Sequence, residues 1–335
     1  MPTNPLLELP EVVEARPRVE DELRLAVQAP TEAMTEMAGH LVGGGKRLRP
    51  LLAVAAAACR AGHTGPVDRD VVRGGVSVEL VQVGSLYHDD VIDEASTRRG
   101  VESVNHRWSN IVAILAGDYL LARASSLAAS LGVEVAGILA ATIGELCQGQ
   151  VLELQRLYDV NRDEDAYFGS IAGKTASLMA TACRIGAIVG GLDRPTVEAL
   201  TEYGRHVGMI FQIVDDILDL TATDEELGKP SGLDLAEGIY TLPVIYALRS
   251  SPELKALLGR PLEPEDVAQG RALTCADGAV ANALAVADEH AAQAARVLSE
   301  AKVDDEVAGA LNRLCRSIIE RTRSAPAAAP GARAS

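Results

Sequence analysis

Two clusters of aspartates with the same spacing are the residues of this chain best suited to chemistry. Their members are Asp89, Asp90 and Asp93 in the first cluster and Asp215, Asp216 and Asp219 in the second. Each cluster lies in apolar sequence typical of a helix, so its first and last aspartates share one helix face. Like charges on one face repel each other unless a cation neutralises them. Carboxylate oxygens suit Mg²⁺, whose remaining positions are filled by water and substrate phosphates. The clusters therefore predict an enzyme that handles a diphosphate.

The lysines offer positive charge for such a substrate. Only five of the 31 lysines and arginines are lysines, and three of these follow a glycine: Lys46, Lys174 and Lys229. A compact ammonium group beside backbone that can approach closely is typical of phosphate sites. The alternative is a coincidence of composition, and the lysines alone do not decide between the two.

The composition indicates a helical protein that does not bind nucleic acids. Alanine and leucine dominate, 48 % of the 335 residues are hydrophobic and 3 % are aromatic, which favours helices around a substantial core. A formal charge of −16 argues against a nucleic-acid partner, because phosphate backbones select basic surfaces. No run of 18 apolar residues lacks a polar interruption, and the start lacks a secretory-signal pattern, so we expect no membrane span. The five scattered cysteines contain no CxxC pair, which favours reduced thiols in the cytoplasm.

Helical patterns separated by short breaks organise the chain. The breaks are rich in glycine, proline and aspartate and fall at 62–66, 98–103, 159–165, 190–195, 221–238 and 259–264. We expect a loosely ordered lead-in and the start of the first helix over 1–30, one helical domain over 31–322, and a disordered Ala/Pro-rich tail over 323–335. The chain has neither the glycine motif of a Rossmann fold nor that of a P-loop.

Five motifs in a fixed order are more specific than any one of them. In chain order they are Gly43–Pro50, the first aspartate cluster with Arg98 and Arg99, Gly173-Lys174-Thr175, Phe211-Gln212 with the second cluster, and Gly228-Lys229. In this order the chain resembles the trans-prenyltransferases, or polyprenyl diphosphate synthases, closely over residues 35–250 and by helical pattern beyond. The resemblance implies an all-α fold: a single-domain bundle of long, mostly antiparallel helices around a central substrate cavity.

The resemblance also implies a magnesium-dependent condensation. Isopentenyl diphosphate would be joined to an allylic diphosphate, such as farnesyl or geranylgeranyl diphosphate, with up to three Mg²⁺ ions beside the allylic diphosphate. Metal ions and fixed cations stabilise the departing diphosphate best where water is scarce. A homodimer is implied as well, with transient membrane contact as a route for product release.

Roles for individual side chains follow from the same resemblance. Direct metal ligands would be Asp89, Asp93 and Asp215, whereas Asp90, Asp216 and Asp219 would bind metal or hold metal-bound water. The allylic diphosphate would be held by Arg98, Lys174 and Lys229, with Thr175, Gln212 and Tyr87 as further candidates. Isopentenyl diphosphate would be bound by Lys46, Arg49, Gln82 and Arg99. The catalytic set is Asp89, Asp90, Asp93, Lys174, Asp215 and Asp216.

Other interpretations stay open for single residues. Paired acids on a helix are often a solvated face, and Arg98-Arg99 alone could be an exposed loop pair. The helix between the motifs carries three polar groups that face either the cavity or solvent: Glu145, Gln150 and Glu153. One position departs from the family pattern, because Ile239 stands where relatives commonly carry a lysine before Thr-Leu-Pro. We expect one diphosphate to be bound more weakly as a result.

Small side chains before the first cluster bear on product length. In the resembling family, the product grows down a tunnel beside this helix, and bulky residues four and five positions before the first aspartate close it. Those positions are Ser85 and Gly84, with Val81 one turn further along. We therefore expect a medium or long product, C30 or longer. The alternatives are a C15–C20 synthase, a class I terpene cyclase, a partner subunit without activity of its own, and a helical scaffold.

Overall fold

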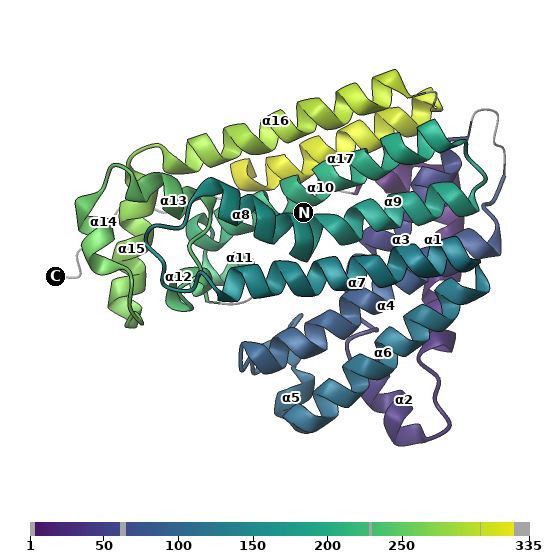
Figure 1. Cartoon of the computed structure of the whole chain (residues 1–335), viewed down its shortest axis with the longest axis horizontal. Coiled ribbons are helices and arrows are strands. Elements are labelled where there is room, and N and C mark those ends of the chain that lie inside the picture. Colours follow the sequence, from purple (N-terminus) through teal and green to yellow (C-terminus); the bar gives the residue numbers. More distant parts are fainter. Residues whose placement is uncertain (1–3, 61–64, 228–229, 302, 325–335) are drawn as a thin grey trace.

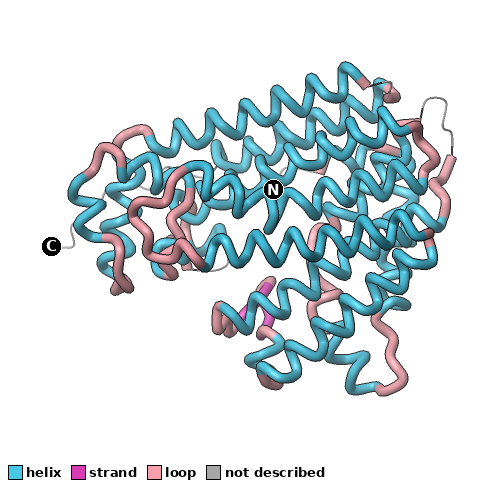
Figure 2. The backbone as a smooth tube through the Cα atoms, in the orientation of Figure 1, coloured by secondary structure: helices cyan, strands magenta, loops and turns pink. Residues whose placement is uncertain are grey.

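The structure of the chain is a computed structural model. It describes residues 4–60, 65–227, 230–301 and 303–324, and for residues 323 and 324 it describes the backbone only. Over these residues the chain consists of helices and loops, apart from one two-stranded hairpin (Figure 2). The prediction of an all-α fold is confirmed.

The first part of the chain ends with the long helix that carries the first aspartate cluster. Its elements are a 3₁₀ turn at Pro5–Glu8, α1 (Pro10–Ala26), α2 (Glu32–Gly39), α3 (Leu48–Ala58) and α4 (Arg69–Ile92). The hairpin follows, with β1 (Thr97–Arg98) antiparallel to β2 (Val101–Glu102). It overlaps the break predicted at 98–103 and begins one residue earlier.

The remaining helices include the one that carries the second cluster, α10. In order they are α5 (Val104–Arg107), α6 (Asn110–Ser130), α7 (Val133–Leu154), α8 (Glu164–Ile171), a π-helical turn η2 (Ala172–Ala176), α9 (Ser177–Val189) and α10 (Arg194–Thr221). Then come α11 (Asp224–Leu227), α12 (Leu233–Ala236), α13 (Leu242–Leu248), α14 (Pro252–Leu257), α15 (Pro264–Ala276), α16 (Ala279–Glu300) and α17 (Asp305–Ser324).

Helix α9 lies between α3 and α10, and α10 packs in turn on α16 and α17 (Figure 1). Helix α4 packs on α3, α6 and α9. Small residues allow these close contacts: a Cβ atom on Gly186 of α9 would lie 2.1 Å from the carbonyl oxygen of Ala53 on α3. Because α4 and α10 both pack on α9, this helix sets the relative position of the two clusters.

The two cluster-bearing helices carry their aspartates near their C-terminal ends. Helix α10 starts where the Asp193 side chain accepts a hydrogen bond from the Thr196 backbone N–H at 3.0 Å, as expected of an N-cap after the predicted break at 190–195. It ends at Thr221, and α4 ends at Ile92. The C-terminal end of a helix carries partial negative charge. Aspartates at this end repel one another and are also repelled by the partial charge of the helix, so they are unfavourable without a cation.

The main hydrophobic core runs through the long helices and reaches the start of the chain. Leu6, Leu9 and Val12 are fully buried in it. A loosely ordered lead-in was expected before the first helix, whereas these apolar side chains bury against the bundle. The first helix expected within residues 1–30 is α1. A second, smaller core unites α12, α13 and α14 with the end of α10, around Tyr240. The disordered tail was predicted for residues 323–335, which lie almost entirely outside the described residues.

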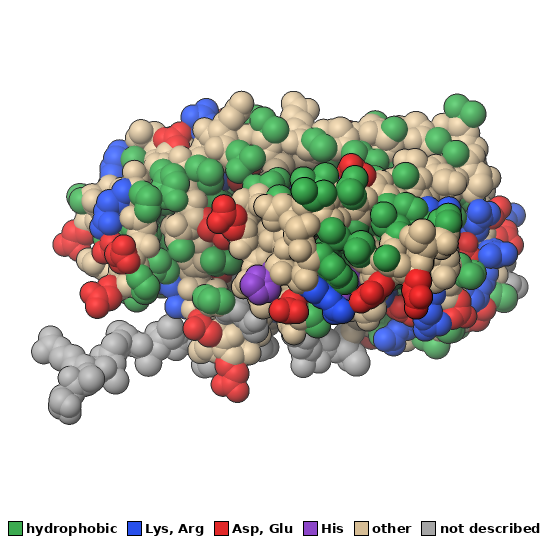
Figure 3. Space-filling view, turned by 90° about the horizontal axis from the view of Figure 1, so that it is seen from below, with side chains coloured by type: hydrophobic (Ala, Val, Ile, Leu, Met, Phe, Trp, Pro, Cys, Tyr) green, Lys and Arg blue, Asp and Glu red, His purple; other side chains and the backbone are tan. Residues whose placement is uncertain are grey.

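Helices α6 and α7 leave apolar side chains exposed. Among the large exposed hydrophobics are Ile111, Ile114 and Leu115 on α6 and Val133, Val151, Leu152 and Leu154 on α7. Figure 3 shows the lower face of the molecule, where hydrophobic side chains gather centrally and charged ones are more frequent toward the ends. By length and composition alone, both helices could cross a membrane, although buried soluble helices pass the same test. The expectation of no membrane span is thus not confirmed.

Candidate active site

The first cluster is built around Asp90, which is fully buried at the end of α4. Its Oδ1 accepts a hydrogen bond from Arg98 Nε at 2.5 Å, and Arg98 Nη2 lies 3.9 Å from Asp93 Oδ2. The hairpin after α4 thus returns Arg98 to the cluster. Asp90 Oδ2 is buried and has no hydrogen-bond partner among the described residues. The cluster therefore retains an acceptor that Arg98 does not satisfy.

Burial raises the pKa values of all three aspartates in the first cluster. It raises the pKa of Asp89 to about 6, with the Asp93 charge raising it further and Lys174 and Arg98 opposing the shift. The pKa values of Asp90 and Asp93 are raised as well, again mainly by burial. Concentrated negative charge that is partly desolvated is the condition under which a cation binds most favourably.

The second cluster holds its middle aspartate with neutral donors. The Tyr167 hydroxyl donates to Asp216 Oδ2 at 2.6 Å, and Gln212 Nε2 donates to Asp216 Oδ1 at 2.7 Å. Thr175 donates in turn to Gln212 Oε1 at 2.6 Å, which fixes the amide. Burial raises the pKa of Asp216 to about 7, against the two hydrogen bonds that lower it. Gln212 and Thr175 thus act here on Asp216.

The other two aspartates of this cluster differ in exposure. Asp215 is exposed and lies 3.8 Å from Arg321 of α17, and Lys46 also interacts with this pair. Asp219 is buried and accepts a hydrogen bond from the Asp234 backbone N–H at 3.3 Å. Asp215 is therefore the carboxylate of this cluster that is most open to a ligand.

Lys174 and Glu153 connect the two clusters. Lys174 Nζ lies 2.5 Å from Glu153 Oε1, and the charges of Asp89 and Asp93 also raise the Lys174 pKa. Glu153 in turn raises the pKa of Asp93 in the first cluster and of Asp216 in the second. One carboxylate thus interacts with both clusters, which face a common space.

Lys174 and Glu153 are positioned by a close approach between the backbones of α7 and η2. A Cβ atom on Gly149 of α7 would lie 2.4 Å from the Lys174 backbone nitrogen, and one on Gly173 would lie 2.6 Å from the Glu145 carbonyl oxygen. Only glycines permit this approach of α7 to η2. Glu153 lies one turn beyond Gly149, so it faces Lys174.

The cations assigned to isopentenyl diphosphate fall into two groups. Arg49 is half-buried and lies near Glu79 and Arg99, and desolvation lowers its pKa to about 10. Arg99 Nη1 donates to the carbonyl oxygens of Leu41 and Gly44 at 3.0 and 2.8 Å. Lys46 interacts with the charges of Arg321 and Asp215, so it lies near the second cluster. Its assignment to isopentenyl diphosphate stays a prediction.

Three assigned residues of α4 lie before the first cluster. Gln82 and Ser85 are half-buried, and Val81 is buried. Gly84 packs against α6, where a Cβ atom would lie 3.1 Å from the Gly117 carbonyl oxygen. The place of Lys229 lies outside the described residues.

Four further residues of the site were missed or left open by sequence reasoning. Glu153 was one of three polar groups on its helix, of which Glu145 is exposed. Tyr167, Arg162 and Arg321 join the site from α8, the loop before it and α17. No motif marks them, because their approach depends on the packing of distant helices.

The carboxylates fit Mg²⁺ that arrives with a diphosphate. Among the residues that the structure describes, no three His, Cys, Asp or Glu side chains form a ready-made metal cage. Mg²⁺ does not need one, since it keeps several waters and uses one or two carboxylates plus substrate phosphates. The buried, unpartnered Asp90 Oδ2 is a hard oxygen donor of the kind that this ion prefers.

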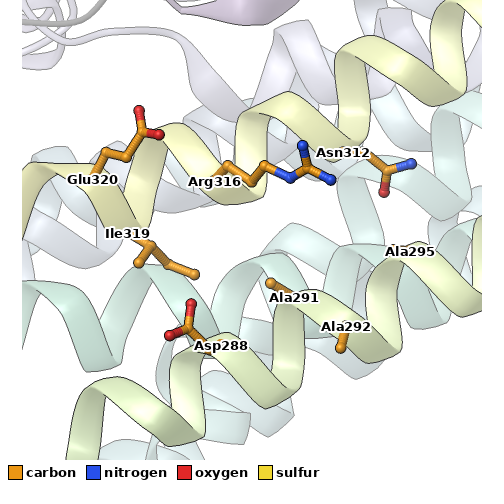
Figure 4. A pocket seen from close by; sticks show the side chains of 8 residues that line it. All are labelled: Asp288, Ala291, Ala292, Ala295, Asn312, Arg316, Ile319 and Glu320. Atoms are coloured by element: carbon orange, nitrogen blue, oxygen red, sulfur yellow. The ribbon is translucent and has the colours of Figure 1, made fainter. Parts of the chain in front are cut away.

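Two cavities are lined by residues of the site, and a third is not. A recess of about 60 Å³ is lined by residues that include Glu153, Lys174 and Asp216. A mostly apolar cavity of about 270 Å³ is lined by Lys46, Phe211, Arg321 and others. A third, of about 300 Å³, lies between α16 and α17 and is lined largely by alanines on the α16 side (Figure 4). No candidate site residue lines this third cavity.

Known proteins share both sequence and fold with this chain. A family model described as polyprenyl synthetase matches residues 31–276. Component 2 of heptaprenyl diphosphate synthase from Geobacillus stearothermophilus is 42 % identical over 261 residues, which are 77 % of this chain and 80 % of that protein. Nonaprenyl diphosphate synthase from Mycobacterium tuberculosis is 41 % identical over 264 residues, 77 % of each chain.

Solved structures extend the similarity to nearly the whole fold. A polyprenyl synthase from Caulobacter crescentus, complexed with calcium and isoprenyl diphosphate, matches with a TM-score of 0.88 and 32 % identity, over 95 % of this chain and 97 % of that one. A decaprenyl diphosphate synthase from Rhodobacter capsulatus matches with a TM-score of 0.86 and 32 % identity, over 95 % and 99 %.

Proposed function

This chain belongs to the polyprenyl synthetase family, and we propose that it condenses isopentenyl diphosphate with an allylic diphosphate such as farnesyl or geranylgeranyl diphosphate. It is a trans-prenyltransferase, and its relatives make medium or long chains. The product is then a trans-polyprenyl diphosphate of C30 or longer.

The observation that carries the proposal is the convergence of both clusters on Lys174 and Glu153. Asp89, Asp93 and Asp215 would hold Mg²⁺, up to three ions together with the allylic diphosphate. When bound, Mg²⁺ neutralises the charge that builds on the departing diphosphate. Lys174 then binds the same diphosphate, and Glu153 holds its ammonium group in place.

The remaining polar groups orient the carboxylates and the second substrate. Arg98 holds Asp90 in one geometry, and Tyr167 does the same for Asp216. Arg49 and Arg99 would bind isopentenyl diphosphate, with Gln82 beside them on α4. Guanidinium groups are suited to this task, since they keep their charge and offer several donors in fixed directions.

The exposed apolar face of α6 and α7 supports a homodimer. Ile111 and Leu115 of α6 and Val133 of α7 are 71 %, 55 % and 92 % exposed, which is unusual for large apolar side chains. Covering them with the same face of a second copy removes this area from water. The relative named component 2 raises the alternative of a different partner chain. We place the enzyme in the cytoplasm, with transient membrane contact when the apolar product leaves.

A product analysis tests the proposed function. The purified chain is incubated with isopentenyl and farnesyl diphosphates, with and without Mg²⁺, and the products are identified by mass spectrometry. A linear polyprenyl diphosphate of C30 or longer that forms only with Mg²⁺ is the expected result. A cyclic hydrocarbon, or no product from a folded chain in the presence of Mg²⁺, would contradict it.

The oligomeric state is tested on the same sample. We expect the active species to have twice the mass of the chain by light scattering, and Val133→Glu with Leu115→Glu to release monomers. Activity that appears only after a second, different protein is added would favour the two-component alternative.

A further inference from the structure

Arg162 is a buried cation that the roles above leave unused. It lies in the loop between α7 and α8, and 4 % of its surface is exposed. Its Nη1 donates to the Tyr240 carbonyl oxygen at 3.1 Å, whereas its Nε and Nη2 have no hydrogen-bond partner among the described residues. A buried donor without an acceptor is costly. These two groups therefore indicate a ligand that brings acceptors.

The loop that carries Arg162 is fixed by the segment before α13. The Tyr158 backbone N–H donates to the Gly238 carbonyl oxygen at 2.8 Å. Gly238 has a φ of +76°, and a Cβ atom there would lie 2.5 Å from the Tyr158 ring. Together with the bond to Tyr240, these contacts hold the Arg162 guanidinium in one place.

Arg162 lines the recess of about 60 Å³ that Lys174 and Asp216 also line. A single water needs roughly 10–15 Å³ on this measure, so the recess has room for about five heavy atoms, the size of one phosphate group. The recess thus connects Arg162 to the residues that bind the diphosphate.

Three carboxylates line the recess, those of Glu153, Asp216 and Asp234, and none of them accepts a hydrogen bond from Arg162 Nε or Nη2. Glu153 is paired with Lys174, and Asp216 accepts hydrogen bonds from Tyr167 and Gln212. Arg162 feels the charges of Glu153 and Asp216 without a hydrogen bond to either. Ile239, which stands where relatives commonly carry a lysine, lines the recess with an apolar side chain.

We propose that Arg162 binds one phosphate of the diphosphate substrate through Nε and Nη2. These two nitrogens form one side of the guanidinium plane, and their parallel N–H bonds fit two oxygens of a single phosphate. The third nitrogen, Nη1, stays with Tyr240 and keeps the plane oriented. This proposal rests on the function proposed above.

Calorimetric titration of the full chain with inorganic pyrophosphate and Mg²⁺ tests the role of Arg162 without turnover. We expect Arg162→Met to weaken pyrophosphate binding by about tenfold to a hundredfold, the usual effect of losing a charged hydrogen-bond donor. Adding Ile239→Lys to this variant should restore most of the affinity, because the new ammonium group enters the same recess. Arg156→Met is the matched control: this exposed arginine of the same loop pairs with Asp159, and its loss should leave the affinity unchanged.

Thermal unfolding separates binding from packing. Arg162→Gln can still donate to Tyr240, so it should fold like the wild type and lose affinity like Arg162→Met. Wild-type affinity in either variant overturns the proposal. So does a loss that Ile239→Lys fails to relieve and that a lower unfolding midpoint accompanies, because Arg162 would then serve packing alone.

Turnover is measured separately on the wild-type chain. Binding of pyrophosphate that does not depend on Arg162, in a chain that condenses its substrates, overturns the role of Arg162 alone. A wild-type chain that forms no condensation product contradicts the proposed function itself.

Discussion

The two aspartate clusters share a spacing and differ in what holds their middle aspartates. Asp90 is paired with a cation, Arg98, which the hairpin after α4 brings back to the cluster. Asp216 is held by the neutral donors Tyr167 and Gln212. A cation stabilises the ionised carboxylate more than neutral donors do. The repeated motif therefore sets where the carboxylates lie, and their surroundings set how they are charged.

The clusters also differ in where their positive charge comes from. The first has Arg98 eight residues after Asp90 in the same segment. The second receives Lys46 and Arg321, from opposite ends of the chain. Lys174 and Glu153 lie between them. The first cluster is thus locally complete, while the second depends on the packing of distant elements.

The largest expected effect comes from removing one outer carboxylate of either cluster. Asp89→Asn and Asp215→Asn should each lower kcat by about a thousandfold, comparable to the loss of a main electrostatic group of an active site. Steady-state kinetics at saturating Mg²⁺ measures this effect. Asp165→Asn, an exposed carboxylate of α8, is the control and should keep wild-type kcat. Near-normal turnover in either cluster variant would remove that cluster from the reaction.

A smaller effect is expected at the residue that links the clusters. Glu153→Gln releases Lys174 from its 2.5 Å contact and should lower kcat/KM for the allylic substrate by about tenfold to a hundredfold. Glu145→Gln changes an exposed carboxylate two turns earlier on α7 and serves as the control. Equal kinetics for both variants would show that the contact does not position Lys174 for its substrate.

Unfolding free energies can compare how strongly Asp90 and Asp216 are stabilised by their different partners. Arg98→Leu leaves the buried Asp90 without its cation and should lower the free energy of unfolding by about 2 kcal/mol, less than for a fully buried pair because Arg98 is partly exposed. Tyr167→Phe leaves Gln212 as a donor to Asp216 and should cost about 1 kcal/mol. Denaturant unfolding without metal measures both. The reverse order would mean that the neutral donors stabilise their aspartate more than the cation does.

Product length tests the face of α4 that precedes the first cluster. Ser85→Phe should shorten the product while condensation continues. Gly84→Phe should instead lower stability, because its side chain would push against the Gly117 backbone of α6. Chromatography of the products, with thermal unfolding of both variants, makes the comparison. An unchanged product length in a folded Ser85→Phe enzyme rules out the tunnel beside α4.

The smallest expected effect is a dependence of metal-free stability on pH. The pKa of Asp216 is about 7 and that of Asp89 about 6, both above the ordinary carboxyl value of 3.8. Between pH 3.8 and these values the folded chain holds protons that the unfolded chain has lost, so the free energy of unfolding falls as pH rises through this window. Thermal unfolding with a chelator, at about pH 5 and about pH 8, measures this contribution together with the opposite one from His206 and His290, whose pKa values burial lowers.

Variants assign this pH dependence to the clusters. Asp216→Asn and Asp89→Asn should each raise the midpoint at about pH 8 relative to that at about pH 5, because each removes a carboxyl group whose pKa is raised in the folded chain. An unchanged pH dependence in both variants would contradict this.

Much of the fold and part of the site followed from sequence. The predicted helix breaks at 190–195 and 259–264 overlap the gaps between observed helices to within two residues, because proline and glycine act locally. The aspartate clusters and Lys174 carried their own motifs, and the structure brings them to one space. Arg162, Tyr167 and Arg321 could not be found in this way. Their role depends on which distant helices meet, and a single sequence contains no local signal for that.

The start of the chain shows what local patterns leave out. A loosely ordered lead-in was expected before the first helix, yet Leu6 and Leu9 are buried, because short apolar runs near a terminus can still add to a core. Lys46, which the resemblance assigns with Arg49 to isopentenyl diphosphate, also interacts with the charges of Asp215 and Arg321. Its assignment stays a prediction.

Binding of Mn²⁺ in place of Mg²⁺ tests most directly whether both clusters hold the same metal–diphosphate unit. Equilibrium titration with inorganic pyrophosphate, followed by paramagnetic resonance, counts the ions bound by the wild type, Asp89→Asn and Asp215→Asn. The account predicts that either substitution abolishes pyrophosphate-dependent binding at both clusters together. Independent binding, in which each variant keeps the ions of the intact cluster at unchanged affinity, would contradict it.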